Sequence, residues 1–191
     1  MKKIASVLIF LFVTFIAFSE SVPNGYGGVE LGMTFEQVKK ALRDNLDFGY
    51  RGERDVSLLP GENRILIETD TSTFAGFSYL DRCWFQFYNE KLYIITININ
   101  REKMDYFSIF DSLCKKYGTP QSVSPEKSVW QSETVTMSLE RPLTLKYVDQ
   151  KLFDEDDMSN FLTSFFECQL KIFDSIDTSS LMSDLLLGFS Y

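Results

Sequence analysis

The same order of patterns occurs twice along the chain: a helical spacing of apolar residues, then short segments in which apolar and polar residues alternate. Thr34 and Gln37 form a capping box, which predicts that the first helix starts directly after Thr34. The second helical pattern covers about 102–117, and Gly118 with Pro120 provides its stop signal. A chain in which the spacing of apolar residues changes in this way, from a helical to an alternating pattern, is expected to pack helices against antiparallel strands.

Each helical pattern is followed by segments typical of strands joined by turns. In 91–100, Ile95, Ile97 and Ile99 alternate with Thr and Asn, so one face of this strand is expected to be buried and the other exposed to solvent. The other predicted strands are 56–59, 64–69, 83–88, 129–130, 134–140 and 143–147. We therefore expect an α+β fold in which two helix-plus-antiparallel-sheet half-repeats form one open sheet, with helices on one face and a further helix at the C-terminus.

The repeated patterns also set the predicted domain limits. The α+β domain covers 34–152, with half-repeats at about 34–100 and 102–152. A glycine-containing lead, 20–33, precedes it, and a helical extension, 153–191, follows it. The lead lacks the Gly-Lys-Ser/Thr ending of a phosphate-binding loop and follows no strand, so we interpret it as a linker.

The N-terminus has the order of a secretory signal peptide, with two lysines before an apolar run over 4–18. Ala17 and Ser19 supply the small residues expected before a cut that precedes Glu20, and Ser19 and Ser21 do so for a cut that precedes Val22. The run is shorter than the roughly 18–20 residues that cross a membrane. We therefore predict that 1–19 is removed and that the mature protein is periplasmic or secreted, without a stable membrane anchor. No cysteine lies near the cut to carry a lipid.

The composition indicates a globular acidic protein. Removal of 1–19 takes two of the 19 Lys and Arg residues, which leaves 17 against 27 Asp and Glu and a net charge of −10. This balance argues against a nucleic-acid partner, because a phosphate backbone is held by clustered Lys and Arg. With 18 Phe and 9 Tyr, the chain also has too much aromatic surface to stay disordered.

The three cysteines, Cys83, Cys114 and Cys168, are widely spaced and odd in number. They fit neither a dense disulfide framework nor a paired zinc spacing. One bridge with one free thiol is an alternative in an oxidising compartment. We expect three reduced and mostly buried thiols.

Catalytic chemistry receives little support. The chain has no histidine, which excludes an imidazole base, a histidine-ligated metal and a histidine-containing triad. Ser124 and Lys127 have a Ser-x-x-Lys spacing, but the companion motifs of penicillin-recognising enzymes are absent, so we interpret Ser124 as a turn residue. The acids that a carboxylate-only hydrolase could use are not distinguished from surface acids: Glu68, Asp70, Asp81 and Glu90. We predict no catalytic, metal or cofactor site and no enzyme activity.

A partner-binding surface is predicted on the aromatic strand 83–88. If Phe85 and Phe87 face the helices, then Trp84, Gln86 and Tyr88 point to the opposite side of the sheet. That side would carry exposed aromatic area, which is typical of binding surfaces. Trp84, Gln86 and Tyr88 are therefore the candidate partner-binding residues.

Short motifs carry a resemblance to known families. Leu31-Gly32-Met33-Thr34, with Val38 inside the helix, resembles the opening of small envelope proteins of the BamE (SmpA/OmlA) type. A second set of features resembles exported proteins with the doubled unit of the β-lactamase-inhibitory-protein architecture: the aromatic strand, the Asn89 turn, the Leu92 strand, 116–120, Trp130 and 147–149. The resemblance covers about 29–152 and implies binding of another protein through an open concave sheet. BamE-type proteins carry a lipid-anchoring cysteine at the cleavage site, which this chain lacks.

Three functions remain after these observations. The first is an exported, non-enzymatic protein-interaction module that binds another envelope or secreted protein through the sheet face. The alternative is a periplasmic small-molecule or lipid carrier, in which the aromatic sheet and the Phe-rich C-terminal helix enclose an apolar pocket. The third is a carboxylate-only hydrolase.

Overall fold

The computed structural model describes residues 21–71 and 78–160. The predicted signal peptide, Cys168 and most of the predicted C-terminal extension lie outside the described residues. The chain divides into two compact units, 1–150 and 151–191, and each is treated by itself. In the second unit, the described residues 151–160 are helical, as expected for a C-terminal helix. Among the described residues, no helix combines the length and apolar character needed to cross a membrane.

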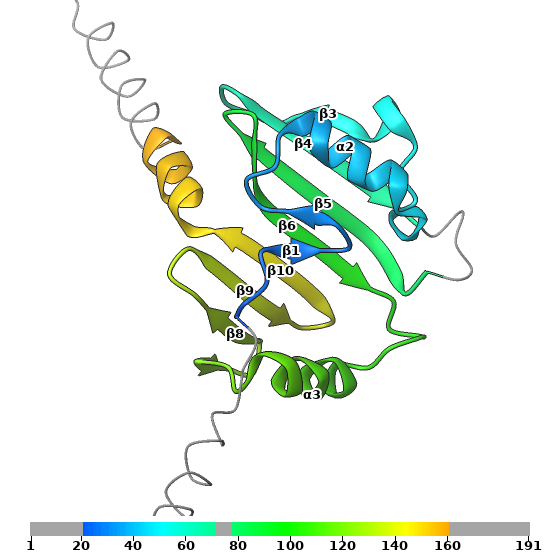
Figure 1. Ribbon diagram of the computed structural model, residues 1–191, viewed down its shortest axis with the longest axis vertical. Coiled ribbons are helices and arrows are strands. Elements are labelled where there is room, and N and C mark those ends of the chain that lie inside the picture. Colours follow the sequence, from blue (N-terminus) through cyan, green and yellow to red (C-terminus); the bar gives the residue numbers. More distant parts are fainter. Residues whose placement is uncertain (1–20, 72–77, 161–191) are drawn as a thin grey trace, which may run out of the picture. The chain divides into compact units, whose positions relative to one another are not determined.

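The first unit is built on one antiparallel sheet (Figure 1). The strands are β3 (Val56–Leu58), β4 (Arg64–Asp70), β5 (Leu80–Tyr88), β6 (Lys91–Ile99), β7 (Ser122–Val123), β8 (Lys127–Gln131), β9 (Val135–Glu140) and β10 (Thr144–Asp149). Their order across the sheet is β3-β4-β5-β6-β10-β9-β8-β7. Each half of the chain therefore forms a four-stranded meander, and the two meanders join through their last strands, β6 and β10.

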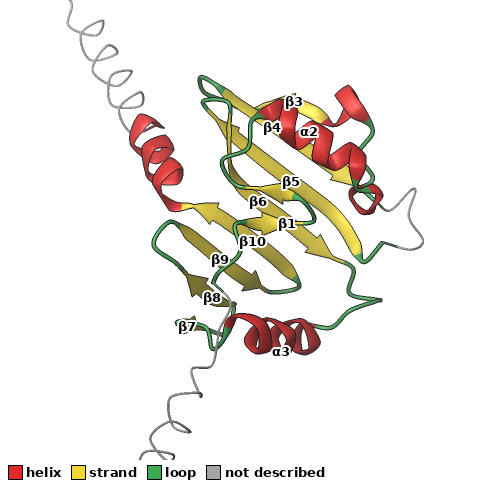
Figure 2. Cartoon of the chain, in the orientation of Figure 1, coloured by secondary structure: helices red, strands yellow, loops and turns green. Residues whose placement is uncertain are grey.

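Two helices precede the two meanders, as Figure 2 shows. α2 (Phe35–Asp44) lies before β3, and α3 (Tyr106–Tyr117) lies before β7. Both pack on the same face of the sheet, because side chains from both helices contact one hydrophobic cluster. The predicted α+β fold, with two half-repeats, one open sheet and helices on one face, is confirmed.

The start of α2 follows from local chemistry. The Gln37 backbone N–H donates to Thr34 Oγ1 at 3.4 Å, and the Thr34 N–H donates to Gln37 Oε1 at 2.8 Å. This reciprocal pair is the predicted capping box. It places Val38 and Leu42 on the buried side of the helix.

Two helix boundaries differ from the sequence prediction. Leu46 continues the apolar spacing of the first helical pattern, but α2 ends at Asp44 and Leu46 is 85% exposed. The second helix starts at Tyr106 instead of 102, because the Asp105 side chain caps it by accepting from the Ser108 N–H. In this shorter helix Phe107 is 74% exposed, although it shares the helical spacing of Phe110 and Cys114.

The lead is not the linker that its glycines suggested. It contains a small hairpin of β1 (Gly25–Tyr26) and β2 (Val29–Glu30), in which Gly27 and Gly28 take the positive φ angles of the turn. Val29 is fully buried. The segment is tied to β6, since the Gly32 N–H donates to the Leu92 carbonyl at 2.7 Å and the Leu92 N–H donates to the Met33 carbonyl at 2.9 Å.

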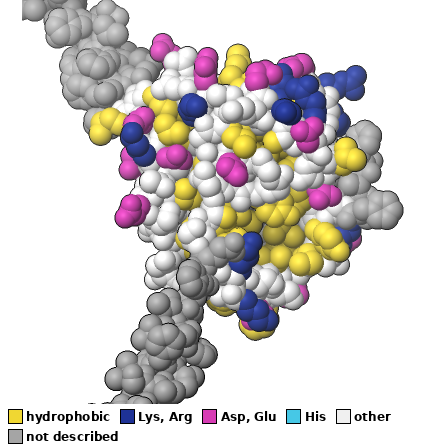
Figure 3. Space-filling model, in the orientation of Figure 1, with side chains coloured by type: hydrophobic (Ala, Val, Ile, Leu, Met, Phe, Trp, Pro, Cys, Tyr) yellow, Lys and Arg dark blue, Asp and Glu magenta, His cyan; other side chains and the backbone are white. Residues whose placement is uncertain are grey.

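The two helices cover the sheet unequally. α2 buries Val38 and Leu42, whereas no residue of α3 is fully buried, although its apolar side chains pack against the core. Figure 3 shows hydrophobic side chains gathered on this face, in the region between α2 and α3. The helix of the second half is therefore the less tightly packed one.

Candidate partner-binding face

The alternation of β5 divides its side chains between the two faces of the sheet. Cys83, Phe85 and Phe87 are fully buried in the cluster under the helices. Trp84, Gln86 and Tyr88 alternate with them and are half-buried on the opposite side. The structure thus brings the three predicted residues together on one face.

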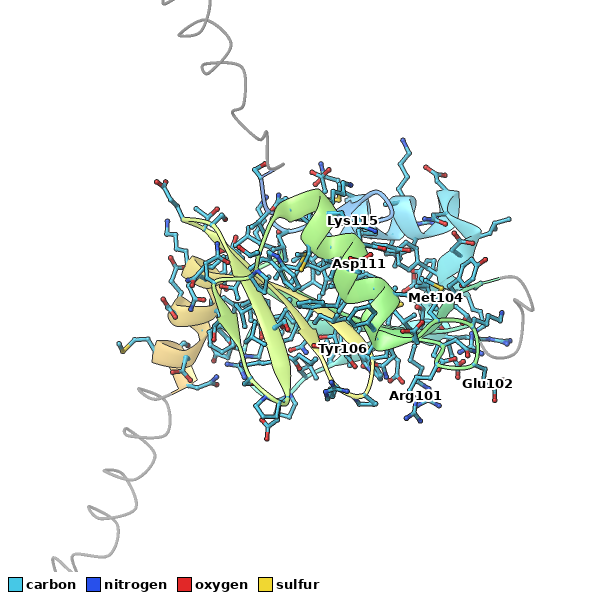
Figure 4. All side chains as sticks on the ribbon, turned by 90° about the horizontal axis from the view of Figure 1, so that it is seen from below. Arg101, Glu102, Met104, Tyr106, Asp111 and Lys115 are labelled. Atoms are coloured by element: carbon cyan, nitrogen blue, oxygen red, sulfur yellow. The ribbon has the colours of Figure 1, made fainter. Side chains whose placement is uncertain are left out.

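We call this side of the sheet the open face, because α2, α3 and the β1–β2 hairpin all pack on the other side (Figure 4). Its residues follow from the strand register: Ser57, Arg64, Leu66, Glu68, Asp70, Arg82, Trp84, Gln86, Tyr88, Lys91, Ile94, Thr96, Asn98, Ser122, Lys127, Val129, Gln131, Thr136, Ser138, Glu140, Thr144, Lys146 and Val148. Trp84 lies in its middle region, between Glu68 of β4 and Thr96 of β6.

A register shift in β6 adds a further aromatic residue. Gln86 pairs with Ile94 and Phe87 pairs with Leu92, so Tyr93 is the extra residue of a bulge. Its ring contacts that of Tyr88, with centroids 6.3 Å apart. Two aromatic rings therefore support each other at one end of the open face, and the consecutive apolar pair Tyr93-Ile94 was the sequence signal for this break in alternation.

Polar pairs border the aromatic region. Arg82 forms ion pairs with Glu68 and Asp70, both at 3.5 Å. Across the sheet, Thr144 Oγ1 donates to Asn98 Oδ1 at 2.8 Å. The open face thus has an aromatic region with polar and charged residues around it.

Three of the four acids considered for a hydrolase have ordinary partners, and the fourth, Glu90, lies exposed in the turn between β5 and β6. Glu68 and Asp70 pair with Arg82, and Asp81 Oδ1 accepts from the Asn100 side chain at 3.4 Å. Asp70 and Asp81 do line one pocket of about 290 Å³, but Arg82 lies in it with them. Within the described ranges, no three His, Cys, Asp or Glu side chains come together as a metal site.

Ser124 acts as a turn residue. Its hydroxyl accepts from the backbone N–H of Glu126 and Lys127, and its Oγ also donates to the Lys127 carbonyl at 3.2 Å. These local bonds use the hydroxyl to close the turn before β8. The Lys127 side chain takes no part in them.

Cys83 and Cys114 are both free thiols. Burial raises the pKa of the Cys83 thiol to about 12, and burial also raises the pKa of Cys114. A thiol held in its neutral form is a poor nucleophile. Neither cysteine therefore has the environment of a reactive site.

Together these features define an α+β protein with a doubled helix-and-meander unit, in which the described helices of the first unit leave one face of the sheet uncovered. A family model described as the TP0088 domain matches residues 24–159, which is most of the chain. The chain belongs to the TP0088 domain family. No curated protein and no solved structure matches it. The comparisons thus give no support to the resemblance to BamE-type proteins or to the β-lactamase-inhibitory-protein architecture.

Proposed function

We propose that this chain is an exported, non-enzymatic interaction module that binds another envelope or secreted protein through the open face. The observation that carries the proposal is the position of Trp84, Gln86 and Tyr88. These side chains lie half-buried on the side of the sheet opposite α2 and α3.

The composition of the open face supports this function. Protein interfaces are enriched in Trp and Tyr at their centre and have a polar rim that excludes water. Trp84 and Tyr88 supply the aromatic part, the buried Tyr93 supports the Tyr88 ring, and Arg82 with its two acidic partners supplies part of the rim. These side chains lie on strands and are already partly ordered, so they lose little conformational entropy when a partner binds.

Export is part of the proposal and rests on the predicted signal peptide, 1–19. The acidic net charge and the absence of histidine make a nucleic-acid partner and imidazole chemistry poor alternatives. A protein partner in the envelope or outside the cell is the class that agrees with all these observations.

A photo-crosslinking experiment tests the proposal directly. A photoreactive phenylalanine analogue is placed at Gln86, in the open face, and in a second strain at Leu46, which is 85% exposed on α2's side of the domain. After irradiation of cells that produce the full chain, crosslinked species are isolated and identified by mass spectrometry. We expect one defined protein adduct from position 86 and no such adduct from position 46.

Alanine variants then establish the role of the aromatic side chains. Trp84→Ala with Tyr88→Ala should abolish the position-86 adduct, whereas the matched helix-side variant Phe107→Ala should keep it. Circular dichroism shows whether each variant is folded. An adduct that persists in the folded double variant, or that forms equally from position 46, would rule out the open face as the binding site.

A further inference from the structure

A groove on the helix side of the sheet, remote from the open face, has the features of a second binding site. It lies between the start of α3 and the β7–β8 hairpin and has a volume of about 470 Å³. Its lining residues are Asp105, Tyr106, Phe107, Phe110, Val123, Ser124, Ser128 and Arg141. This volume falls within the range of about 300–1,000 Å³ that is usual for small-molecule sites.

Arg141 is held in a fixed position at this groove. Its Nε donates to the Pro125 carbonyl at 2.9 Å, and its guanidinium carbon lies 4.4 Å from the centroid of the Tyr106 ring. In the part of the chain that the structure describes, no carboxylate forms an ion pair with Arg141. The two terminal nitrogens of its planar fork are therefore free of an acidic partner, and this fork matches a carboxylate in bidentate geometry.

Tyr106 provides the support for Arg141. Its hydroxyl donates to the Leu139 carbonyl at 3.2 Å and lies 3.3 Å from Ser128 Oγ, which fixes the ring between α3 and the sheet. Figure 4 shows Tyr106 at the start of α3, toward the strands, whereas Asp111 and Lys115 form an ion pair further along the helix. The arginine and its aromatic support are thus set in place before any ligand arrives.

The remaining wall of the groove is apolar and open to solvent. Phe107 is 74% exposed and Val123 is 66% exposed. Phe110 stacks on Tyr106 with a ring separation of 6.4 Å. Exposed apolar side chains beside an arginine without an acidic partner suit a molecule with one anionic end and one apolar end.

The acidic residues near the groove either accept hydrogen bonds from other residues or line a neighbouring pocket. Asp105 accepts from the N–H and the hydroxyl of Ser108, and these bonds hold the pKa of Asp105 below its ordinary value. Arg141 also lines a neighbouring pocket with Glu126, Lys127 and Glu140. Of those two carboxylates, Glu140 accepts a hydrogen bond at Oε1 from the Ser138 hydroxyl at 2.9 Å.

We propose that the groove binds a small amphiphilic carboxylate, such as a medium-chain fatty acid. The carboxylate pairs with the Arg141 guanidinium, and the chain lies against Phe107, Phe110 and Val123. This site is independent of the open face, so either proposal can fail while the other stands.

Isothermal titration calorimetry with three ligands of equal chain length tests the charge requirement. Decanoate, decanol and decyltrimethylammonium are each titrated into the mature protein, the two ionic ligands below their critical micelle concentrations and decanol below its solubility limit. We expect decanoate to bind at least ten-fold more tightly than decanol, and the cation to bind no better than decanol. Equal affinity for decanoate and decanol, preference for the cation, or no binding of decanoate would overturn the proposal.

Trp130 locates the bound ligand, because its ring lies 6.0 Å from that of Phe110 and is almost fully buried. The chain has two tryptophans, so Trp84→Phe leaves Trp130 as the only one. Decanoate should change the Trp130 emission with the affinity that calorimetry gives. Binding without any such change would place the ligand elsewhere.

Substitution of the arginine provides the specific control. Arg141→Gln should remove the preference for decanoate over decanol, and Arg141→Lys should keep part of it, because lysine preserves the charge but not the planar fork. The matched variant Arg54→Gln removes an exposed arginine outside the groove and should bind decanoate like the unaltered protein. If Arg54→Gln weakened decanoate binding as much as Arg141→Gln does, net charge alone would explain the loss of affinity, and the proposed site would be refuted.

Discussion

Alanine at Phe85 and at Trp84 tests the alternation on which the open face depends. The two residues are neighbours in β5, but Phe85 is fully buried and Trp84 is only half-buried on the other side. Phe85 also contacts the Phe48 ring edge to face, with centroids 5.6 Å apart. The larger side chain should therefore contribute less to stability than the smaller one.

The expected magnitudes follow from burial. Phe85→Ala empties a core site and should cost about 3–5 kcal/mol. Trp84→Ala removes side-chain area of about 200 Å², of which roughly half is buried, and at about 25 cal/mol per Å² this gives about 2.5 kcal/mol as an upper limit. We expect a difference of about 2 kcal/mol between the two variants.

Urea denaturation followed by circular dichroism measures this difference. With a slope of about 2 kcal/mol per molar urea, it corresponds to midpoints about 1 M apart. Phe87→Ala and Gln86→Ala repeat the comparison two residues further along β5, so the four variants should alternate between high and low cost. Equal costs for Trp84→Ala and Phe85→Ala, or a reversed order, would refute the assignment of the two faces.

Two other predictions concern Cys83 and the first helix. Burial raises the pKa of the Cys83 thiol in the folded state to about 12, so this thiol ionises at lower pH in the unfolded chain. The free energy of unfolding should therefore fall as pH rises from about 9 to 12, by up to about 1.4 kcal/mol per pH unit. Urea midpoints measured across this range should fall less steeply with pH in Cys83→Ala than in the unaltered protein. Thr34→Ala removes the cap of α2 and should cost about 1 kcal/mol in urea denaturation, whereas Thr34→Ser should cost less because it keeps the hydroxyl. An unchanged midpoint in Thr34→Ala would show that the capping box contributes nothing.

The predictable parts of the fold depend on interactions between residues close in sequence. The capping box joins Thr34 to Gln37, and the strand signal of β6 depends on every second residue. These patterns fix the helix start and the buried face before any tertiary contact is known. Trp84, Gln86 and Tyr88 could be assigned to the opposite face for the same reason.

The parts that sequence reasoning missed depend on contacts across the chain. The strands of the β1–β2 hairpin have two residues each, too few to show an alternating pattern, and the hydrogen bonds that tie this segment to Leu92 of β6 come from Gly32 and Met33 directly after it. Arg141 and Tyr106 are 35 positions apart, and only the packing of α3 against the β8–β9 hairpin brings them together. The exposed Phe107 depends on a boundary set by one side chain, Asp105.

The two half-repeats differ in how they use the same architecture. In the first half, α2 and the β1–β2 hairpin bury apolar side chains tightly, and that half carries Trp84, Gln86 and Tyr88 on its reverse side. In the second half, α3 has no fully buried residue, and a groove opens at its start. A tightly packed half can hold a preorganised protein-binding face, whereas a loosely packed helix leaves apolar area to a small ligand. The two sites that we propose on opposite faces of the sheet therefore agree with this unequal packing.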